Sequence, residues 1–301
     1  MVSLAGRTAI ITGAGRGLGR EHALRFAELG ANVIVNDNGA GADGDGTDSS
    51  PAQAVVDEIT TKGGKAVAHV GSVTDWESAA AMVELAVSSF GGLDILINNA
   101  GILRDRTTVN MSETEWDSVI DVHLKGHFCA LRHAAAYWRD QAKAGTPRKA
   151  AVVNTSSGSG LKGNPGQLNY AAAKAGIAAM TIVAARELER YGVRVNAIAP
   201  VARTRLTLQT PGMGERLTAD ETAGGWDKWS PANVTPLVSY LAQENCHISG
   251  QVFSVMGGHV GLEQGWTLID QWNKDRSWTE DELAEALAKV PSAPPEFDVS
   301  I

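Results

Sequence analysis

The hydrophobic positions of this chain follow two alternating patterns. Short apolar runs, many of them rich in β-branched residues, are separated by longer stretches in which apolar residues recur at helical spacing. The short runs predict strands at 8–12, 32–37, 65–70, 94–99, 150–155, 193–199 and 251–257. The longer stretches predict helices near 17–29, 51–63, 75–90, 113–143, 168–190 and 231–243. Such alternation predicts a doubly wound α/β fold, in which helices cover both faces of a mostly parallel, seven-stranded sheet.

Two capping boxes mark helix starts. Ser112 precedes Glu115 by three residues, and Thr279 precedes Glu282 by the same spacing. In a capping box each side chain bonds the backbone N–H group of the other residue. The second box predicts a helix in the C-terminal region, beyond the last strand of the sheet.

Three stretches interrupt the alternation. Residues 38–50 are rich in Gly, Asp and Ser and predict a long loop after the second strand. Residues 201–229 are too irregular for one element and are a candidate mobile lid. The region after 258, with three tryptophans, exceeds what the sheet requires. We expect one α/β domain over 1–258 and, over 259–301, a C-terminal extension packed on the same domain.

Composition and charge narrow the class of protein. The net charge of -8, without a basic cluster, argues against a nucleic-acid partner. Cys129 and Cys246 give neither a disulfide framework nor metal-ligand spacing, so no metal is expected. No apolar run approaches the ~18 residues of a membrane span, and the N-terminus lacks a secretory pattern. We expect a cytoplasmic protein with no membrane partner.

A glycine-rich turn connects the first strand to the first helix. Gly13, Gly17 and Gly19 fit the pattern T-G-x-x-x-G-x-G, in which backbone can approach a pyrophosphate at a helix N-terminus. A plain tight turn is the alternative. Asp37 ends the second strand about twenty residues on, where an acid can bond the adenosine ribose hydroxyls and repel a 2′-phosphate; a turn residue is its alternative. Arg16 is a counter-signal because it could pair with that phosphate, and we expect NAD rather than NADP.

Ser157, Tyr170 and Lys174 form the pattern S-x12-Y-x3-K. Tyr170 and Lys174 share one helix face. An unperturbed phenol, with a pKa of about 10, is too weakly acidic for a base at neutral pH. A nearby ammonium and the positive charge of oxidised nicotinamide both favour phenolate. Tyr170 can then take the hydroxyl proton as hydride leaves the carbinol carbon, while Ser157 holds the substrate oxygen and Lys174 can hold the nicotinamide ribose.

Together with "NNAG" at 98–101, these motifs resemble the short-chain dehydrogenase/reductase family, over residues 5 to about 258. The resemblance implies a Rossmann fold, reversible oxidation of a secondary alcohol, and a homodimer or homotetramer built on the helices of 113–143 and 168–190. The cofactor contacts that it implies are Gly13, Arg16, Gly17, Leu18, Gly19, Asp37, Ser72, Val73, Asn99, Ala100, Gly101, Tyr170, Lys174, Pro200 and Thr204.

Three positions depart from the family pattern. His123 stands where the family commonly has an asparagine that completes a catalytic tetrad and holds a relay water. Histidine can donate and accept hydrogen bonds, so a relay role is open, and so is a core histidine satisfied by backbone carbonyls. Ser72 replaces an adenine-binding aspartate, and Val201 replaces the glycine after Pro200.

These departures, with "GILRDR", "DVHLKG" and "GNPGQLNYAAAK", resemble the (3R)-hydroxyacyl-CoA dehydrogenase unit of peroxisomal multifunctional enzymes of type 2 and their actinobacterial single-domain relatives. The expected function is therefore NAD-dependent oxidation of a 3-hydroxyacyl-CoA, including a steroid-derived one. The alternatives are a hydroxysteroid or other lipophilic alcohol dehydrogenase, an NADPH-dependent 3-oxoacyl reductase, and a nucleotide-sensing protein. Within the candidate lid, Arg203, Arg205 and Arg216 are either solvated surface groups or cations for CoA phosphates.

Overall fold

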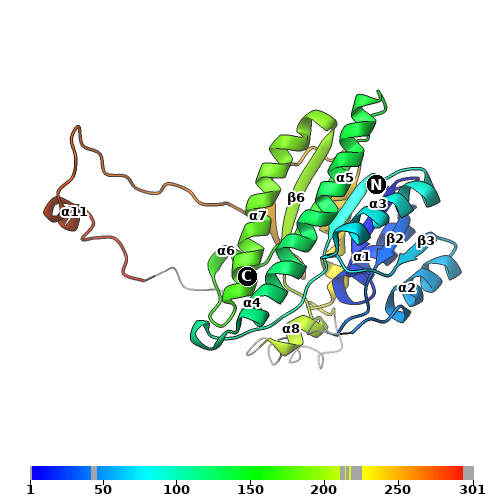
Figure 1. Cartoon of the computed structure of the whole chain (residues 1–301), viewed down its shortest axis with the longest axis horizontal. Coiled ribbons are helices and arrows are strands. Elements are labelled where there is room, and N and C mark those ends of the chain that lie inside the picture. The colour runs from blue at the N-terminus through cyan, green and yellow to red at the C-terminus, as the bar shows by residue number, and fades with distance from the viewer. Residues whose placement is uncertain (1, 42–45, 211–213, 215–216, 218–225, 294–301) are drawn as a thin grey trace.

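The chain folds around one sheet with the strand order β3-β2-β1-β4-β5-β6-β7-β8 (Figure 1). The computed structural model describes residues 2–41, 46–210, 214, 217 and 226–293. Strands β1 to β7 pair in parallel, whereas β8 pairs antiparallel with β7. Helices cover both faces of the sheet (Figure 1). The predicted doubly wound fold is confirmed.

The strands are β1 Thr8–Thr12, β2 Asn32–Asn36, β3 Lys65–His69, β4 Ile95–Asn98, β5 Ala150–Thr155, β6 Val193–Pro200, β7 Val252–Met256 and β8 His259–Glu263. The α-helices are α1 Gly17–Glu28, α2 Ser50–Thr61, α3 Trp76–Phe90, α4 Glu113–Ile120, α5 Gly126–Lys143, α6 Gly158–Lys162, α7 Leu168–Leu188, α8 Arg205–Gln209, α10 Thr235–Ala242 and α11 Glu280–Ala286. Short 3-10 helices cover Thr108–Asn110, Glu189–Tyr191 and Pro231–Asn233, and a π-helical turn covers Asp121–Lys125.

The core divides into two layers because successive strand side chains point to opposite faces of the sheet. Ile11 of β1 belongs to the layer under α1, α2 and α10, whereas Ile10 belongs to the layer under α3, α5 and α7. In the second layer Trp138 is fully buried, and its indole nitrogen donates to the Leu93 carbonyl at 2.8 Å. The apolar runs therefore form fully buried parallel strands, as their sequence predicts.

The predicted single helix over 113–143 is interrupted. The π-helical turn Asp121–Lys125 separates α4 from α5. A π turn adds a residue to the helical repeat and is frequently found at functional sites. Here it carries His123, whose side chain is buried. Both predicted capping boxes are present, at the start of α4 and at the start of α11.

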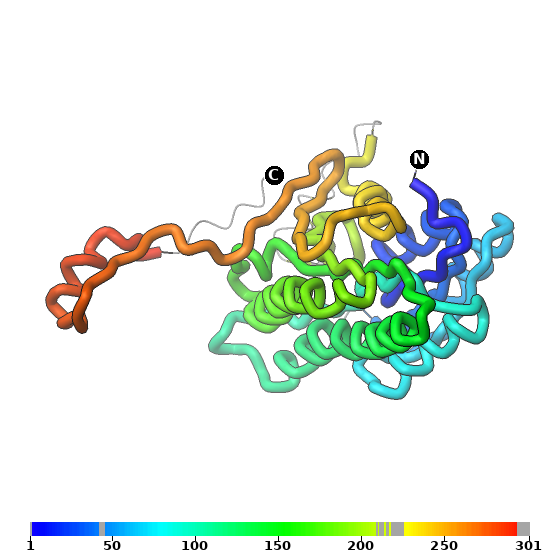
Figure 2. The backbone as a smooth tube through the Cα atoms, turned by 90° about the horizontal axis from the view of Figure 1, so that it is seen from above, coloured from blue at the N-terminus to red at the C-terminus, as the bar shows by residue number. Residues whose placement is uncertain are grey.

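The region after residue 258 differs from the expected packing. Its first residues form β8, an eighth strand that pairs with the free edge of β7 and was not predicted. The chain after Glu263 then runs away from the α/β body to α11 (Figures 1 and 2). Trp266 is fully exposed there, and Ile269 is almost so. The domain boundary at 258 stays a prediction. The described residues after Glu263 do not pack on the α/β body as expected.

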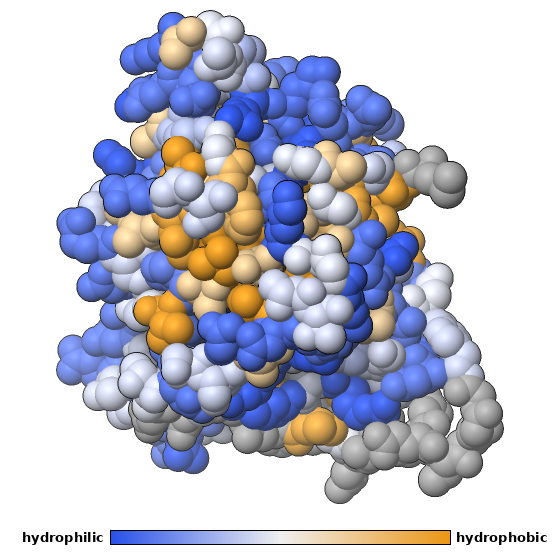
Figure 3. Space-filling model, turned by 90° about the vertical axis from the view of Figure 1, so that its right-hand side faces the viewer, coloured by the Kyte–Doolittle hydropathy of each residue, from blue (hydrophilic) through white to orange (hydrophobic). Residues whose placement is uncertain are grey.

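The opposite edge of the sheet is β3, whose residues are only partly buried. Hydrophobic residues gather near the middle of the face that carries α2 and β3, with hydrophilic residues around them (Figure 3). Val70, which follows β3, is 49% exposed. Hydrophobic exposure of this size at a sheet edge is ordinary for a folded domain.

One helix among the described residues, Leu168–Tyr191, is long and apolar enough to span a membrane by length and composition alone. The helix is not the uninterrupted apolar run considered in the sequence analysis, because it contains Lys174 and Arg186. The helix packs in the body on β6 and α6 and bears Tyr170 and Lys174. This packing buries 44% of its most apolar window.

Candidate active site

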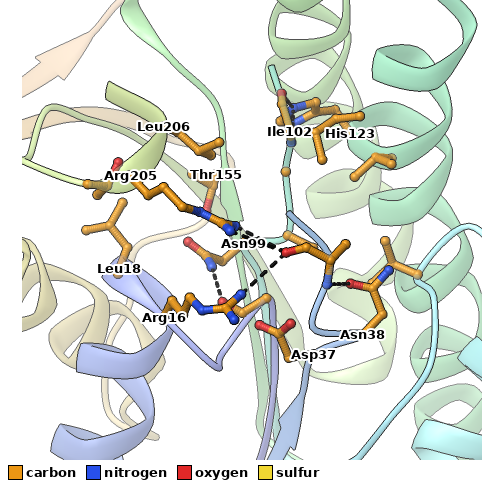
Figure 4. Close-up of a pocket in the computed structure, with 18 of the residues that line it drawn as sticks. Arg16, Leu18, Asp37, Asn38, Asn99, Ile102, His123, Thr155, Arg205 and Leu206 are labelled. Carbon is orange, nitrogen blue, oxygen red and sulfur yellow. Dashed lines mark hydrogen bonds between the residues drawn. The ribbon is translucent and has the colours of Figure 1, made fainter. Parts of the chain in front are cut away.

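A cavity of about 210 Å³ opens at the carboxyl ends of the central strands, which is where open α/β sheets bind ligands (Figure 4). Every predicted site residue lines it except Gly19 and Ser157. The lining residues that the sequence did not predict as cofactor contacts or catalytic groups are Asn36, Asn38, Ala40, Gly41, Gly71, Ile102, Val122, Thr155, Ser156, Ala202, Arg205, Leu206 and Thr207. Most of them are next to a predicted residue in the sequence. The residues around each predicted strand end could therefore have been included in the predicted site.

The glycine turn forms a cradle into which a side chain would not fit. Gly13 has φ +62, and a Cβ atom there would lie 2.8 Å from the Cα of Ala100. Gly19 faces inward, because a Cβ atom on it would lie 2.3 Å from the Gly13 carbonyl oxygen. Gly19 therefore supports the turn by close packing. Asn99 secures the turn from β4, since its side-chain amide donates to the Thr12 carbonyl at 3.0 Å.

Asp37 lies at the end of β2, and both oxygens of its carboxylate accept hydrogen bonds. Oδ2 accepts from the Gly15 N–H group at 2.8 Å, and Oδ1 accepts from the Gly39 N–H group at 2.7 Å. A carboxylate oxygen has two lone pairs, so each can still accept a ribose hydroxyl. Asp37 thus organises the turn after β2 and also presents an acid to the cavity. The structure therefore shows the role of Asp37 in a turn. Its role in binding the ribose hydroxyls stays a prediction.

Two arginines converge at this end of the cavity. The guanidinium groups of Arg16 and Arg205 both point to the Ala40 carbonyl oxygen, at 3.4 Å from each side (Figure 4). Arg205 belongs to α8, so this contact joins the segment after β6 to the loop after β2. Positive charge therefore faces the cavity close to Asp37.

Tyr170 and Lys174 lie together at the start of α7, as their spacing predicts. The Lys174 ammonium nitrogen is 5.5 Å from the centroid of the Tyr170 ring, and it donates to the Thr155 carbonyl oxygen at 2.6 Å. The Ser157 side chain is hydrogen-bonded to Tyr170. The S-x12-Y-x3-K residues are thus brought to one place, although Ser157 is not part of the cavity wall.

The electrostatics of this group differ from the sequence expectation. Burial raises the pKa of Tyr170 to about 12, and the hydrogen bond with Ser157 only partly opposes the rise. Burial also lowers the pKa of Lys174 to about 7. Desolvation of the charged forms is therefore the largest influence on both pKa values in the protein by itself. The expected phenolate also depends on the positive charge of oxidised nicotinamide, so the role of Tyr170 as the base stays a prediction.

His123 projects from the π turn against the segment that follows β4. Its ring stands at 90° to the Tyr170 ring with the centroids 5.1 Å apart, and its Nε2 atom lies 2.8 Å from the Ile102 carbonyl oxygen. Burial and the nearby Lys174 hold the pKa of His123 well below its usual range, so the imidazole is neutral. A Cβ atom on Gly101 would lie 2.3 Å from the ring. This geometry fits a histidine bonded to backbone, and the relay role stays a prediction.

Of the two other departures from the family pattern, Ser72 lines the cavity, whereas Val201 lies between the lining residues Pro200 and Ala202. The Ser72 hydroxyl is 2.9 Å from the Thr74 hydroxyl. Val201 continues the sheet, because its N–H group donates to the Val255 carbonyl at 2.9 Å. Backbone pairing of this kind does not need glycine. Pro200 therefore lines the cavity although valine follows it.

The candidate lid is only partly described. Residues 211–213, 215–216 and 218–225 lie outside the described residues, and they include the predicted cation Arg216. Arg203 forms an ion pair with Asp227 and donates to the Leu217 carbonyl. Arg203 therefore has a structural role. Arg205, which lines the cavity, is the remaining described candidate for binding CoA phosphates.

Among the described residues, no group of three or more His, Cys, Asp or Glu side chains could hold a metal ion. The described part of the cavity presents instead an acid, two guanidinium groups, and the Tyr170 and Lys174 side chains. Such an arrangement can bind a dinucleotide along the strand ends and can exchange a proton at its inner end.

The chain that forms this site is similar to several known proteins. A family model described as short chain dehydrogenase matches residues 7–210. The chain is 47% identical over 292 residues to a hydroxyacyl-CoA dehydrogenase, ChsB1, of Mycobacterium tuberculosis, covering 94% of this chain and 88% of that protein. It is 43% identical over 253 residues to peroxisomal multifunctional enzyme type 2 of Drosophila melanogaster, covering 84% of this chain but only 39% of that longer protein.

A solved structure of a short chain dehydrogenase from Mycobacterium avium superposes with a TM-score of 0.84 at 49% identity. The match covers 95% of this chain and 94% of that chain. The similarity therefore extends over nearly the whole length of the molecule and includes most of the region after residue 258.

Proposed function

Because the chain belongs to the short chain dehydrogenase family and is thus an oxidoreductase that acts on CH–OH groups with a nicotinamide nucleotide, we propose that it oxidises a 3-hydroxyacyl-CoA with NAD. The observation that carries the substrate class is the 47% identity to a hydroxyacyl-CoA dehydrogenase along 94% of the chain. The acyl group is lipophilic, and a steroid-derived acyl group is within the proposal.

The residues at the strand ends fit a dinucleotide. The cradle at Gly13 has no room for a Cβ atom, which is what a close approach of backbone to a pyrophosphate requires. Asp37 favours NAD, because its carboxylate can accept the ribose hydroxyls and would repel a 2′-phosphate. Arg16 and Arg205 supply positive charge for phosphates nearby. When bound, the oxidised nicotinamide accepts the hydride.

The chain's own residues move the proton. Ser157 donates a hydrogen bond to the substrate oxygen and holds it beside Tyr170. Tyr170 takes the hydroxyl proton from the alcohol, and returns it in the reverse reaction. Lys174 lies next to both Tyr170 and the Thr155 carbonyl, from which position it can also hold the ribose. Added positive charge at this end lowers the pKa of Tyr170 from about 12.

A turnover assay tests the proposal. The purified chain is given NAD or NADP with a 3-hydroxyacyl-CoA series, a hydroxysteroid series and simple secondary alcohols, and formation of the reduced nucleotide is followed. We expect the highest kcat/KM for a hydroxyacyl-CoA with NAD. A hydroxysteroid that exceeds every CoA thioester would move the assignment to the first alternative. Nucleotide binding without turnover of any alcohol would indicate a sensing protein.

Assembly and location complete the proposal. The outer faces of α5 and α7 form a groove of about 400 Å³ between them, with Phe128 48% exposed and Val183 52% exposed on the helices. We expect these faces to meet a second copy in a homodimer or homotetramer in the cytoplasm. Light scattering of the purified chain measures the assembly, and a monomer at micromolar concentration would contradict it.

A further inference from the structure

Asp105 is a partly buried carboxylate that no step above uses. It lies on the segment after β4, where this segment crosses the chain before α7. The two stretches are bound together on either side of it. The Arg106 N–H group donates to the Gly166 carbonyl at 2.8 Å, and the Asn169 side-chain amide donates to the Arg104 carbonyl at 3.0 Å. Asp105 is therefore held at a fixed place close to the start of the catalytic helix.

A chain of hydrogen bonds starts from this carboxylate. Gln167, which is 4% exposed, donates from Nε2 to Asp105 Oδ2 at 2.8 Å. The Oε1 atom of Gln167 accepts from the Ser159 hydroxyl at 2.8 Å and from the Asn164 amide at 2.9 Å. An ionised carboxylate can only accept hydrogen bonds. Asp105 therefore fixes which end of the Gln167 amide faces Ser159.

The chain ends at Ser157. The Ser159 N–H group donates to Ser157 Oγ at 3.2 Å, and Ser157 is thereby the N-cap of α6. This bond occupies a lone pair of Oγ, so the Ser157 hydroxyl proton is left to be donated elsewhere. It bonds with Tyr170 in the protein, and the substrate oxygen is the corresponding acceptor during the reaction.

We propose that Asp105 is a positioning residue for Ser157, acting through Gln167 and Ser159, so that the Ser157 hydroxyl donates its proton into the active site. The proposal rests on the proposed function, because it requires Ser157 to hold the substrate oxygen. Removal of the acceptor at position 105 frees the Gln167 amide to turn. Ser159 then loses its partner, and the direction of the Ser157 hydroxyl is no longer set.

The negative charge of Asp105 also affects the pKa of Tyr170, and this effect can be measured in the pH profile. Its carboxylate raises the pKa of Tyr170, in addition to the larger effect of burial. The pKa of Asp105 itself is raised by burial and lowered by the bond from Gln167. Its Oδ1 atom is buried and has no partner among the described residues.

Other charged groups meet at the same place. The charged groups are Arg104 and Arg106 on the same segment, Glu115 of α4 in an ion pair with Arg106, and Lys174 of α7. The imidazole of His123 on the π turn is titratable but neutral. Of these groups, only Asp105 contacts Gln167 through a carboxylate in the described structure. Substitutions at position 105 can therefore remove the charge alone, or the charge together with the hydrogen-bond acceptor.

Three variants test the proposal through the pH profile of alcohol oxidation. Asp105→Ala removes both the acceptor and the charge, Asp105→Asn removes only the charge, and Ser159→Ala breaks the chain without touching the carboxylate. Asp117→Asn on α4 is the control, since it makes the same chemical change on an exposed residue. Melting temperature and nucleotide Kd are measured for each variant, to separate unfolding from misplacement.

We expect the plateau kcat to fall on the order of 10-fold in Asp105→Ala and Ser159→Ala, and less in Asp105→Asn, because an amide oxygen can still accept from Gln167. The pH at half-maximal rate should move down in both Asp105 variants, since loss of a negative charge favours phenolate, and should not move in Ser159→Ala or Asp117→Asn. A parent-like plateau in Asp105→Ala, or a midpoint that shifts equally in all four variants, overturns the proposal.

A parent chain that oxidises no secondary alcohol contradicts the proposed function and leaves a structural test of Asp105. In crystal structures of the parent and of Asp105→Ala, the Gln167 amide should turn and Ser157 Oγ should leave the Ser159 N–H group. Unchanged positions of both side chains would overturn the positioning role independently of any activity.

Discussion

The Lys174 ammonium nitrogen lies 5.5 Å from the centroid of the Tyr170 ring while it donates a 2.6 Å hydrogen bond to the Thr155 carbonyl oxygen. The lysine is thus anchored to β5 and presents its charge beside the phenol rather than in direct contact with its oxygen. Burial of this pair disfavours both ions, since the pKa of Lys174 is lowered to about 7 while that of Tyr170 is raised to about 12. Protonation of Lys174 in the folded protein therefore carries a free-energy cost.

Lys174→Met should show this cost as a dependence of stability on pH. The folded pKa of about 7 lies below the ordinary lysine pKa of 10.5, so burial costs nothing in highly alkaline solution and its full cost is present below pH 7. The unfolding free energy of Lys174→Met relative to the parent should therefore fall by a few kcal/mol as the pH rises from 7 to 10.5. Urea unfolding at a series of pH values measures it. A difference that is independent of pH would contradict the lowered pKa.

Tyr170→Phe should abolish most of the turnover and leave the fold intact. Only the hydroxyl is removed, and the ring that faces His123 remains. We expect kcat to fall at least ~100-fold, the usual scale for a general acid–base group, with nucleotide Kd nearly unchanged. Steady-state kinetics and fluorescence titration measure the two quantities. Tyr191→Phe, on the far side of the molecule, is the matched control, and a variant within a few-fold of the parent would exclude Tyr170 as the base.

Much of this site could be predicted from local sequence, because its motifs lie at the ends of apolar strands. The strand β8 could not, since "HVGLE" is a short run with only two apolar residues, and it pairs in the sheet only with β7. The contact of Asp105 with Gln167 joins residues 62 apart and depends on how two loops cross. The raised pKa of Tyr170 in the protein by itself could not be predicted either, because helical spacing reveals a neighbouring charge but not the burial that opposes it.

Asp37→Asn should shift the choice of nucleotide. The amide can keep one of the bonds from Gly15 and Gly39, but the charge that repels a 2′-phosphate is lost. Arg16 remains available to pair with that phosphate. The ratio of kcat/KM for NADP to that for NAD should rise, on the order of 10-fold for the loss of one repulsive contact. The double variant Asp37→Asn/Arg16→Ala should lose most of this gain. A parent that already prefers NADP would contradict the role of Asp37.

Gly101→Ala should destabilise the chain through His123. The added Cβ atom would lie 2.3 Å from the imidazole, which is itself buried against Ile102 and Tyr170. We expect a loss of roughly 1–3 kcal/mol of unfolding free energy, the usual cost of overpacking a core. The double variant Gly101→Ala/His123→Ala should recover part of it, because the clash is removed. Gly265→Ala, where a Cβ atom meets nothing within 4 Å, is the control. Independent, additive losses would show that the two residues are not coupled.

Arg203 and Arg205 are only two residues apart, but we expect different effects from their substitution. Loss of Arg203 should affect stability, and loss of Arg205 should affect substrate binding. Arg203 is tied to Asp227 and to the Leu217 carbonyl, so Arg203→Ala should lower stability and affect all substrates alike. Arg205 projects from α8 at the cavity with its guanidinium near the Ala40 carbonyl. A CoA thioester carries phosphates that can pair with it.

Arg205→Ala should therefore raise the KM for a hydroxyacyl-CoA several-fold, as the loss of a charge-assisted hydrogen bond would, and leave the KM for an alcohol without CoA unchanged. Arg205→Lys should recover part of the loss, because the charge remains although the planar fork is gone. Nucleotide Kd is measured in parallel, since Arg205 also lies near the proposed cofactor phosphates. Equal effects on both substrates, with weaker nucleotide binding, would assign Arg205 to the cofactor. The hydroxysteroid alternative would then gain against the CoA thioester.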